Sequence, residues 1–350
     1  MIKILHSADW HLDSPLQLDA SLRAALSKIP EKLASLCQKE QCDLVLLSGD
    51  LFDGPAAPAT VQTLKQCLAS MQVPVFITPG NHDFVGAGSP WLTEVFPENV
   101  HIFTKNTIDS VSLPALNCRV YGAGFTSMDC CGILQDFTAR QDEQYAIGIF
   151  HGDPTQVNSP YCPITTAQVQ GSNLDYLALG HIHKGGSFRA GKTLCAWPGC
   201  PMGRGYDEEG EKGALIVTID DTVTTRFVSL DTPRFYDLEV SVGEDAAASL
   251  AAVLPPVGNR DFYRITFVGT GDPLDLSALL RADFPNLVLR DKTTMPVDIW
   301  SNAGEDSFEG LYFGSLKAAL QNADEDTARQ IRLAAKISKQ ILEGQEVDLP

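Results

Sequence analysis

The chain has 350 residues, 44% of them hydrophobic, and a net charge of −18 at pH 7. This length suffices for one large domain with a smaller one, or for two of moderate size. The acidic surplus is spread along the chain without a basic tail, which excludes attraction of nucleic acid through the overall charge. A phosphate-bearing ligand would have to be held by local cations such as bound metal.

The cysteines and the N-terminus indicate the cellular setting. The nine cysteines are scattered without C-x-x-C pairs, which favours reduced thiols over a disulfide framework or a zinc ribbon. The opening MIKILHSADW lacks the pattern of a secretion signal, and no apolar stretch reaches the ~18 residues of a membrane span. We therefore expect a cytoplasmic protein without a membrane partner.

The first 230 residues alternate between strand and helix patterns. Extended apolar runs predict strands at MIKILHSAD, DLVLLSGD and PVFITPGNHD, with helix-like stretches at 21–39 and 60–71, and then strands at YAIGIFHGD and LDYLALGHIH. This alternation predicts an α/β fold. Mixed pairing and a second sheet layer are expected from closely spaced runs at CRVYGAGF, GSFRA, TLCAWPG, GALIVTI and TVTTRFVSL.

A small α+β module is predicted beyond the Thr-Pro at 232–233. Its strands are FYDLEVSV, FYRITFVG and NLVLRDK, with helix-like stretches at 245–253 and 274–282. Two amphipathic helices are expected from 305 to 343, meeting near 322–326. We therefore expect domains at 1–230, 231–303 and 304–350.

Polar side chains directly follow five of the predicted strands. They are Asp9 and His11, Asp50, Asn81 with His82, His151, and His181 with His183. Sites assemble at the carboxyl ends of strands in α/β sheets, so these groups are expected to converge. The spacings Asp-x-His and His-x-His place two side chains on the same side of an extended segment.

This set of side chains has the chemistry of a metal centre. Imidazoles mixed with carboxylates and an amide oxygen suit manganese, iron or zinc rather than calcium. Seven ligand groups are too many for one such ion. They suit two ions about 3.5–4 Å apart that share a carboxylate, an arrangement that clamps both oxygens of an in-line phosphoryl displacement.

The ordered motifs DxH, GD, GNHD, H and GHxH resemble those of the calcineurin-like metallophosphoesterases, over residues 1 to about 225. The resemblance implies a two-sheet sandwich flanked by helices, with two divalent metal ions, manganese above iron or zinc, that activate water for in-line attack. It implies that Asp50 bridges the ions and that His82 faces the scissile phosphate. The implied ligands are Asp9, His11, Asp50 and His183 for one ion, and Asp50, Asn81, His151 and His181 for the other.

Longer stretches are similar to one branch of that superfamily, the DNA double-strand-break repair exonucleases of the SbcD and YhaO type. These stretches are ILHSADWHLDSPL, SGDLFD, WPGCPMGRGYDEEGEKG and, near the end, SFEGLYFGSLKAAL. The similarity implies a nuclease subunit that acts on DNA with an SMC-like coiled-coil ABC-type ATPase. It also implies a small capping domain within 231–303, and it leaves a homodimer open.

Asp53 distinguishes the branches. It lies three residues after Asp50, where some repair nucleases of this type carry His. Serine/threonine phosphoprotein phosphatases carry an Asp there that is followed by Arg and Gly, whereas Gly54 follows Asp53 in this chain. A carboxylate at this position would orient His82 and favour its imidazolium form.

Other polar residues have structural interpretations. His6 and His101 lie inside apolar runs and are expected to be structural. Asp13 and Asp153 are expected to cap a loop or a helix. Arg204 could meet a phosphate or fix its own Gly-rich loop, and the sequence leaves both roles open.

Three functions remain open at this point. The first is a metal-dependent DNA nuclease subunit, the second a small-molecule phosphodiesterase or phosphatase, and the third a non-catalytic assembly subunit. The complete ligand set argues against the third. In the last helix, Leu333 and Ile337 lie off the main apolar face, so the helix packs within the chain or against a partner. That face is formed by Ile331, Ala334, Ala335, Ile341 and Leu342.

Overall fold

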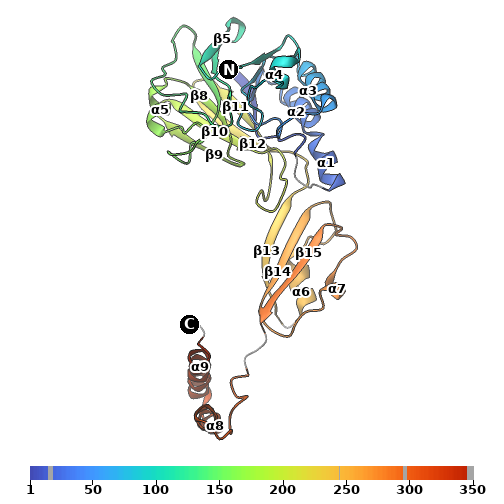
Figure 1. Cartoon of the computed structure of the whole chain (residues 1–350), viewed down its shortest axis with the longest axis vertical. Coiled ribbons are helices and arrows are strands. Elements are labelled where there is room, and N and C mark those ends of the chain that lie inside the picture. The colour runs from blue at the N-terminus through green and yellow to red at the C-terminus, as the bar shows by residue number, and fades with distance from the viewer. Residues whose placement is uncertain (15–18, 244, 295–297, 345–350) are drawn as a thin grey trace. The chain divides into compact units, whose positions relative to one another are not determined.

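A computed structural model describes residues 1–14, 19–243, 245–294 and 298–344 (Figure 1). Residues 15 and 16 of the stretch ILHSADWHLDSPL and the end of the expected C-terminal segment, 345–350, lie outside the described residues. The chain divides into two compact units. One comprises 1–238, 257–265 and 281–288, and the other 239–256, 266–280 and 289–350.

The first unit contains two mixed sheets. In the first sheet, β1 to β4 run parallel, β11 pairs antiparallel with β1, and β12 pairs antiparallel with β11, in the order β12-β11-β1-β2-β3-β4. The strands are β1 (Ile2–Ser7), β2 (Leu44–Leu47), β3 (Val75–Ile77), β4 (Val100–Ile102), β11 (Gly213–Ile219) and β12 (Val223–Ser229).

The second sheet has the order β5-β6-β7-β8-β10-β9, with antiparallel strands at both edges and parallel strands between them. The strands are β5 (Asp109–Leu113), β6 (Cys118–Gly122), β7 (Tyr145–His151), β8 (Tyr176–Gly180), β9 (Lys184–Ala190) and β10 (Thr193–Gly199). The expectation of an α/β fold with a second, mixed sheet layer is confirmed.

Central strands such as β2 and β8 are buried on both faces because their sheets are covered there on both sides. In β2, Leu44 and Leu46 pack in the core between the sheets with Ile147 and Tyr176. The alternate residues Val45 and Leu47 pack with residues of the flanking helices, among them Leu33, Leu64 and Leu68. This alternation follows from the two-residue period of a strand.

The helix-like stretch at 21–39 is two helices, α1 (Ala20–Leu26) and α2 (Ile29–Glu40). Pro30 lies in the first turn of α2. Its ring would clash with the carbonyl of Leu26, four residues earlier, so α1 cannot continue through it. The next helix, α3 (Pro58–Ser70), follows the prediction, whereas the short α4 (Pro90–Thr93) and α5 (Thr166–Gly171) were not anticipated.

The rest of the chain is α+β and then helical. A three-stranded sheet of β13 (Phe235–Ser241), β14 (Phe262–Thr270) and β15 (Leu287–Thr294) is accompanied by α6 (Ala246–Val253) and α7 (Leu276–Leu279). The helix predicted to reach 282 ends earlier, because Leu280 is extended. Two helices follow, α8 (Phe308–Leu320) and α9 (Glu325–Leu342), as expected. No helix of the described residues is long and apolar enough to cross a membrane.

His6 has the structural role expected of it. Its side chain is fully buried on β1, where Nδ1 contacts Tyr176 Oη at 2.7 Å and Nε2 contacts the carbonyl oxygen of Leu179 at 3.1 Å. Burial lowers the pKa of His6 to about 3, although the bond to Leu179 opposes this. His6 therefore stays neutral in the folded protein.

Replacing His6 by Gln should reduce the acid sensitivity of folding. The unfolded imidazole has a pKa of about 6.5, so between pH 6.5 and 3 the unfolded chain binds a proton that the folded chain does not. Stability is therefore lost as the pH falls, by about 1.4 kcal/mol per pH unit from this group. Urea unfolding of the metal-free proteins at pH 7 and pH 5 measures it. An equal loss in both proteins would contradict the assignment.

Candidate metal centre

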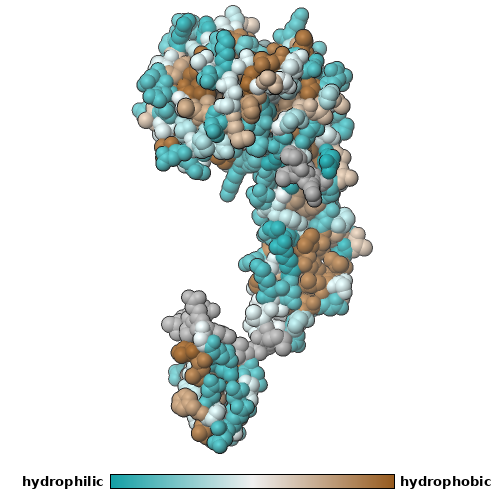
Figure 2. All heavy atoms as spheres, viewed as in Figure 1, coloured by the Kyte–Doolittle hydropathy of each residue, from teal (hydrophilic) through white to brown (hydrophobic). Residues whose placement is uncertain are grey.

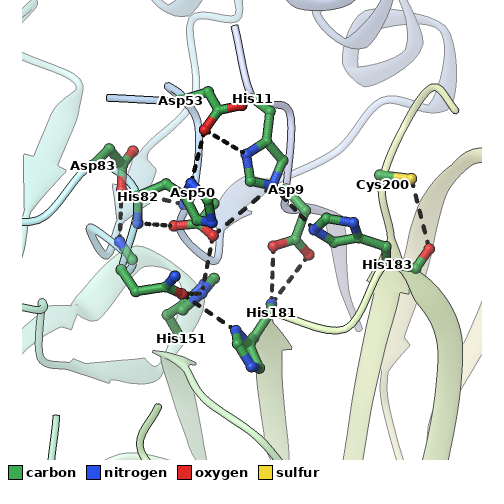
Figure 3. Close-up of polar contacts among 12 residues, drawn as sticks. Asp9, His11, Asp50, Asp53, His82, Asp83, His151, His181, His183 and Cys200 are labelled. Carbon is green, nitrogen blue, oxygen red and sulfur yellow. Dashed lines mark hydrogen bonds and ion pairs between the residues drawn. The ribbon is translucent and has the colours of Figure 1, made fainter. Parts of the chain in front are cut away.

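The polar groups that follow the five strands meet in the first unit. Figure 3 shows Asp9, His11, Asp50, His151, His181 and His183 pointing toward one another. The loops after β1, β2 and β3 of the first sheet contribute Asp9, His11, Asp50, Asn81 and His82. In the second sheet, the end of β7 contributes His151 and the loop after β8 contributes His181 and His183. The structure thus brings together all the residues that were expected to converge.

Asp9, His11 and His183 form one group. Nε2 of His11 lies 3.0 Å from Nε2 of His183, and one carboxylate oxygen of Asp9 and one nitrogen of each imidazole lie within 4.8 Å of one another. Two imidazole nitrogens that face each other repel through their lone pairs unless one carries a proton or a cation lies beside them. This geometry is suited to a cation.

A second group surrounds Asn81. Its side-chain oxygen lies 2.9 Å from Nε2 of His151 and 3.3 Å from Nδ1 of His181. Oδ2 of Asp50 lies 3.3 Å from Nε2 of His151 and 3.9 Å from Nε2 of His11, so Asp50 lies between the two groups. Burial would lower the pKa of His151, but the Asp50 carboxylate raises it to about 9. A metal ion that binds here has to displace a proton.

The backbone at the centre is strained. Asp9, His11, Asp50 and His181 have φ values of 56°, 49°, 52° and 100°, in the left-handed region that non-glycine residues rarely adopt. Such conformations cost about 1–3 kcal/mol each and occur where the surroundings enforce them. Here the amides of Asp9 and His11 donate to the carbonyl oxygens of Gly49 and Asp50, each at 3.0 Å. The loops after β1 and β2 hold each other in place.

Asp83 joins the loops after β2 and β3. Its carboxylate accepts hydrogen bonds from the amides of Gly80 at 2.7 Å and Leu51 at 2.8 Å. Burial and the nearby Asp50 carboxylate raise the pKa of Asp83 to about 7. Gly80 is required at this junction, since a Cβ there would lie 2.2 Å from Oδ1 of Asp50. The motif GNHD contains Asp83, but the sequence did not reveal this role.

His82 differs from its neighbours because its side chain is 46% exposed. Its Nδ1 lies 2.8 Å from Oδ1 of Asp53, and its amide donates to Oδ1 of Asp50 at 2.9 Å. The hydrogen bond to Asp53 raises the pKa of His82, although partial burial opposes this. Burial opposes ionisation of Asp53, yet the nearby His11 imidazole, 3.8 Å away, and the hydrogen bonds with His82 and with Ser14, at 2.7 Å, hold its pKa well below the usual range. Nε2 is the ring nitrogen of His82 that Asp53 leaves available.

The sequence did not indicate a role for Glu208 and left the role of Arg204 open. Oε1 of Glu208 lies 2.6 Å from Nδ1 of His183 and accepts a hydrogen bond from Arg204 at 2.8 Å. The same guanidinium donates to Oδ2 of Asp53 at 3.4 Å. The stretch GRGYDEEGEKG carried the only signal, a Glu four residues after an Arg, which in a loop does not reveal where either side chain points.

The remaining polar candidates lie in structural contacts. Asp13 accepts hydrogen bonds from the Ala57 amide and the Thr60 hydroxyl, each at 2.8 Å, at the start of α3. Asp153 accepts from the amides of Thr155 at 2.7 Å and Gln156 at 3.1 Å within its loop. His101 on β4 packs against Phe103, with ring centroids 4.7 Å apart.

The family of the chain is identified by comparison with known proteins. The model of the calcineurin-like phosphoesterase family matches residues 2–185, which include all five strand ends. The chain belongs to this family. Since the fold and the clustered ligand groups are those of a metallophosphoesterase, they imply divalent metal ions. The expected family and sandwich fold are confirmed.

Relatives of this metallophosphoesterase include members of the SbcD and YhaO branch. It is 29% identical over 309 residues to the uncharacterized metallophosphoesterase YhaO of Bacillus subtilis (strain 168), which covers 82% of this chain and 74% of that protein. It is 23% identical over 332 residues to the SbcD subunit of the nuclease SbcCD from Staphylococcus epidermidis, covering 82% of this chain and 84% of that protein. A dimetal phosphatase structure from Danio rerio is 12% identical, with a TM-score of 0.43, and covers 65% of this chain and 99% of that one.

Proposed function

We propose that this metallophosphoesterase cleaves phosphodiester bonds in DNA with two metal ions, as the nuclease subunit of an assembly with an SMC-like coiled-coil ABC-type ATPase. The observation that carries the proposal is the position of Asp50 between two groups of nitrogen and oxygen ligands. The choice of DNA is supported by relatives that are SbcD subunits of the nuclease SbcCD.

We assign Asp9, His11, Asp50 and His183 to one ion and Asp50, Asn81, His151 and His181 to the other. The donors fit manganese, iron or zinc, and manganese is our choice because oxygen ligands are present in both groups. His11 supports the fit, since its Nε2 lies 3.0 Å from Nε2 of His183 and 3.9 Å from Oδ2 of Asp50. Two such ions would polarise the phosphoryl oxygens and supply an activated water.

Residues of the chain orient the substrate and neutralise its negative charge. His82 is held at Nδ1 by Asp53, so its Nε2–H is free to donate to a phosphoryl oxygen or to the departing alkoxide. Its raised pKa favours the imidazolium, which is the form that can donate at Nε2 while Nδ1–H stays on Asp53. The buried Asp83 keeps the turn that carries Asn81 and His82 in register with Asp50.

A second candidate function is a small-molecule phosphodiesterase or phosphatase. The net charge of −18 favours it, because an acidic surface repels duplex DNA. The DNA proposal therefore requires that a partner supplies the positive surface. A phosphoprotein phosphatase is disfavoured, since Gly54 follows Asp53 where that group carries Arg.

A manganese-dependent cleavage assay tests the proposal. The protein, with and without a co-expressed coiled-coil ATPase, is given single-stranded DNA, duplex DNA and bis(p-nitrophenyl) phosphate. We expect cleavage of the small diester by the chain alone and ATP-stimulated cleavage of DNA by the assembly. Cleavage of the small diester without any cleavage of DNA by the assembly would favour the second candidate.

We further propose that 231–303 is a capping domain and that 304–350 binds the ATPase. The C-terminal helices pair with each other through Tyr312 Oη and Ser338 Oγ, 2.9 Å apart. Phe308 and Leu311 on α8 remain 76% and 68% exposed, and Ile341 on α9 remains 60% exposed. Figure 2 shows hydrophobic residues on these helices. An amphipathic helix with such residues is suited to a groove on a coiled coil.

Replacing Leu311 and Ile341 together by Asp should abolish co-purification with the ATPase. Both side chains are exposed, so the fold should tolerate the change, whereas a buried charge in an interface costs several kcal/mol. Pull-down of the tagged ATPase measures it, with exposed Lys336→Asp on α9 as the control. Hydrolysis of the small diester should stay unchanged. Full co-purification of the double variant would show that the partner binds elsewhere.

A further inference from the structure

A buried network of charged side chains connects His183 with His82. Glu208 contacts His183 at 2.6 Å, Arg204 contacts Glu208 at 2.8 Å and Asp53 at 3.4 Å, and Asp53 contacts His82 at 2.8 Å. The side chains of Glu208, Arg204 and Asp53 are only 6%, 9% and 11% exposed. Removing charged groups from water to this degree is unfavourable unless they are paired.

Stabilisation of their own loop does not account for all these contacts. Within the loop, the Arg204 amide donates to Oε2 of Glu208 at 2.8 Å, and the Glu208 amide donates to the Gly205 carbonyl at 3.0 Å. These bonds would suffice to close the loop. Oε1 of Glu208 instead faces His183, and one guanidinium nitrogen of Arg204 faces Asp53, so both side chains extend to the proposed centre.

We propose that Glu208 and Arg204 are positioning residues of the metal centre. Glu208 accepts the Nδ1–H of His183 and thereby directs Nε2 of that ring toward the metal ion, and Arg204 ties Glu208 to Asp53, which orients His82. The inference rests on the proposed function, since it uses the assignment of His183 as a ligand. A carboxylate behind a metal-bound imidazole fixes its tautomer and makes it a stronger ligand.

The other group of ligands is held differently. Nδ1 of His151 lies 2.8 Å from the backbone carbonyl of Ser48. Nε2 of His181 lies 4.0 Å from Asp153, beyond hydrogen-bond distance. Removing Glu208 should therefore weaken one metal site and spare the other.

Manganese binding to Glu208→Ala tests this inference. Equilibrium dialysis followed by metal analysis should give two equivalents for the wild type. In the variant one equivalent should bind about 10–100-fold more weakly and the other unchanged. The matched control is Glu209→Ala, which removes the same group one residue along, where the side chain is exposed. Unchanged affinity for both equivalents in Glu208→Ala would overturn the inference and leave the proposed function intact. A wild type that fails to hold two equivalents would overturn both.

Arg204→Met separates the effect of Glu208 on His183 from the effect of Asp53 on His82. At saturating manganese, Glu208→Ala should regain most of the wild-type kcat on the small diester, because the metal is restored and Arg204 still contacts Asp53. Arg204→Met should keep a kcat about tenfold or more below wild type, since Asp53, which orients His82, loses its bond to the guanidinium even when metal is bound. A wild-type kcat in Arg204→Met would overturn the tie to Asp53.

The tautomer of His183 tests the inference without any change to the network. Long-range ¹H–¹⁵N spectra of the zinc-loaded wild type should show His183 with its proton on Nδ1, identified by the signals that are lost in His183→Asn. A proton on Nε2 would overturn the role of Glu208. This measurement stands even if the alanine variant does not fold.

Discussion

Replacing His82 by Ala should lower kcat on a small phosphodiester by about 10²- to 10⁴-fold while the protein keeps both metal ions. This is the range expected for loss of a general acid and of a donor to the phosphoryl oxygens. His82 is suited to both tasks because its side chain is 46% exposed, Asp53 holds its Nδ1 at 2.8 Å, and its pKa is raised. Steady-state kinetics with metal analysis of the same samples measures the effect.

Two further variants make this test specific. His101→Ala removes an imidazole that packs on Phe103 away from the centre and should leave kcat unchanged. Asp53→Asn should lower kcat less than His82→Ala, because the imidazole stays but loses its charged partner. An alternative to our assignment is a metal ion held by Asp53, His11 and His82. One oxygen of Asp53 and one nitrogen of each imidazole lie within 4.8 Å of one another. If activity in His82→Ala fell only as far as metal content fell, His82 would be a ligand and our assignment would be wrong.

Replacing Asp50 by Asn should weaken both metal sites at once and abolish activity at micromolar manganese. The change keeps the shape of the side chain and an oxygen for the His82 amide, which now donates to Oδ1 at 2.9 Å. It removes a carboxylate charge that lies 3.9 Å from His11 and 3.3 Å from His151. A bridging carboxylate interacts with both ions, so its loss cannot be confined to one site.

Metal analysis after dialysis against limiting manganese measures the effect of Asp50→Asn. Asp207→Asn is a suitable control, because Asp207 is exposed in the loop beside Glu208. We expect two equivalents in the wild type and the control, and less than one in Asp50→Asn. Full occupancy in Asp50→Asn would exclude a bridging role for this carboxylate.

The convergence of ligands could be predicted from sequence because strand ends impose it. Apolar runs such as DLVLLSGD show where a strand ends, and parallel strands end at one edge of a sheet. Asp50 and Asn81 follow neighbouring strands of the first sheet, so their proximity follows from the α/β pattern. His151 ends β7 of the second sheet and reaches them only through the packing of the two sheets. The side chains of β2 alternate between two cores for the same reason of strand geometry.

The roles of Glu208 and Asp83 could not be predicted in this way. Glu208 lies in a loop that has no periodicity, and its contact with His183 depends on how that loop folds across the sheet edge. Asp83 accepts hydrogen bonds from backbone amides of two different loops, and only the tertiary structure brings these loops together. The break between α1 and α2, by contrast, follows from Pro30, whose effect on the preceding turn is local.

Anomalous diffraction from crystals of the wild-type protein grown with manganese is the most direct test of the central claim, a two-metal centre bridged by Asp50. We predict two peaks, about 3.5–4 Å apart. One should contact Asp9, His11 and His183, the other Asn81, His151 and His181, and Asp50 should contact both. A single peak, or a peak held by Asp53 and His82, would contradict the account.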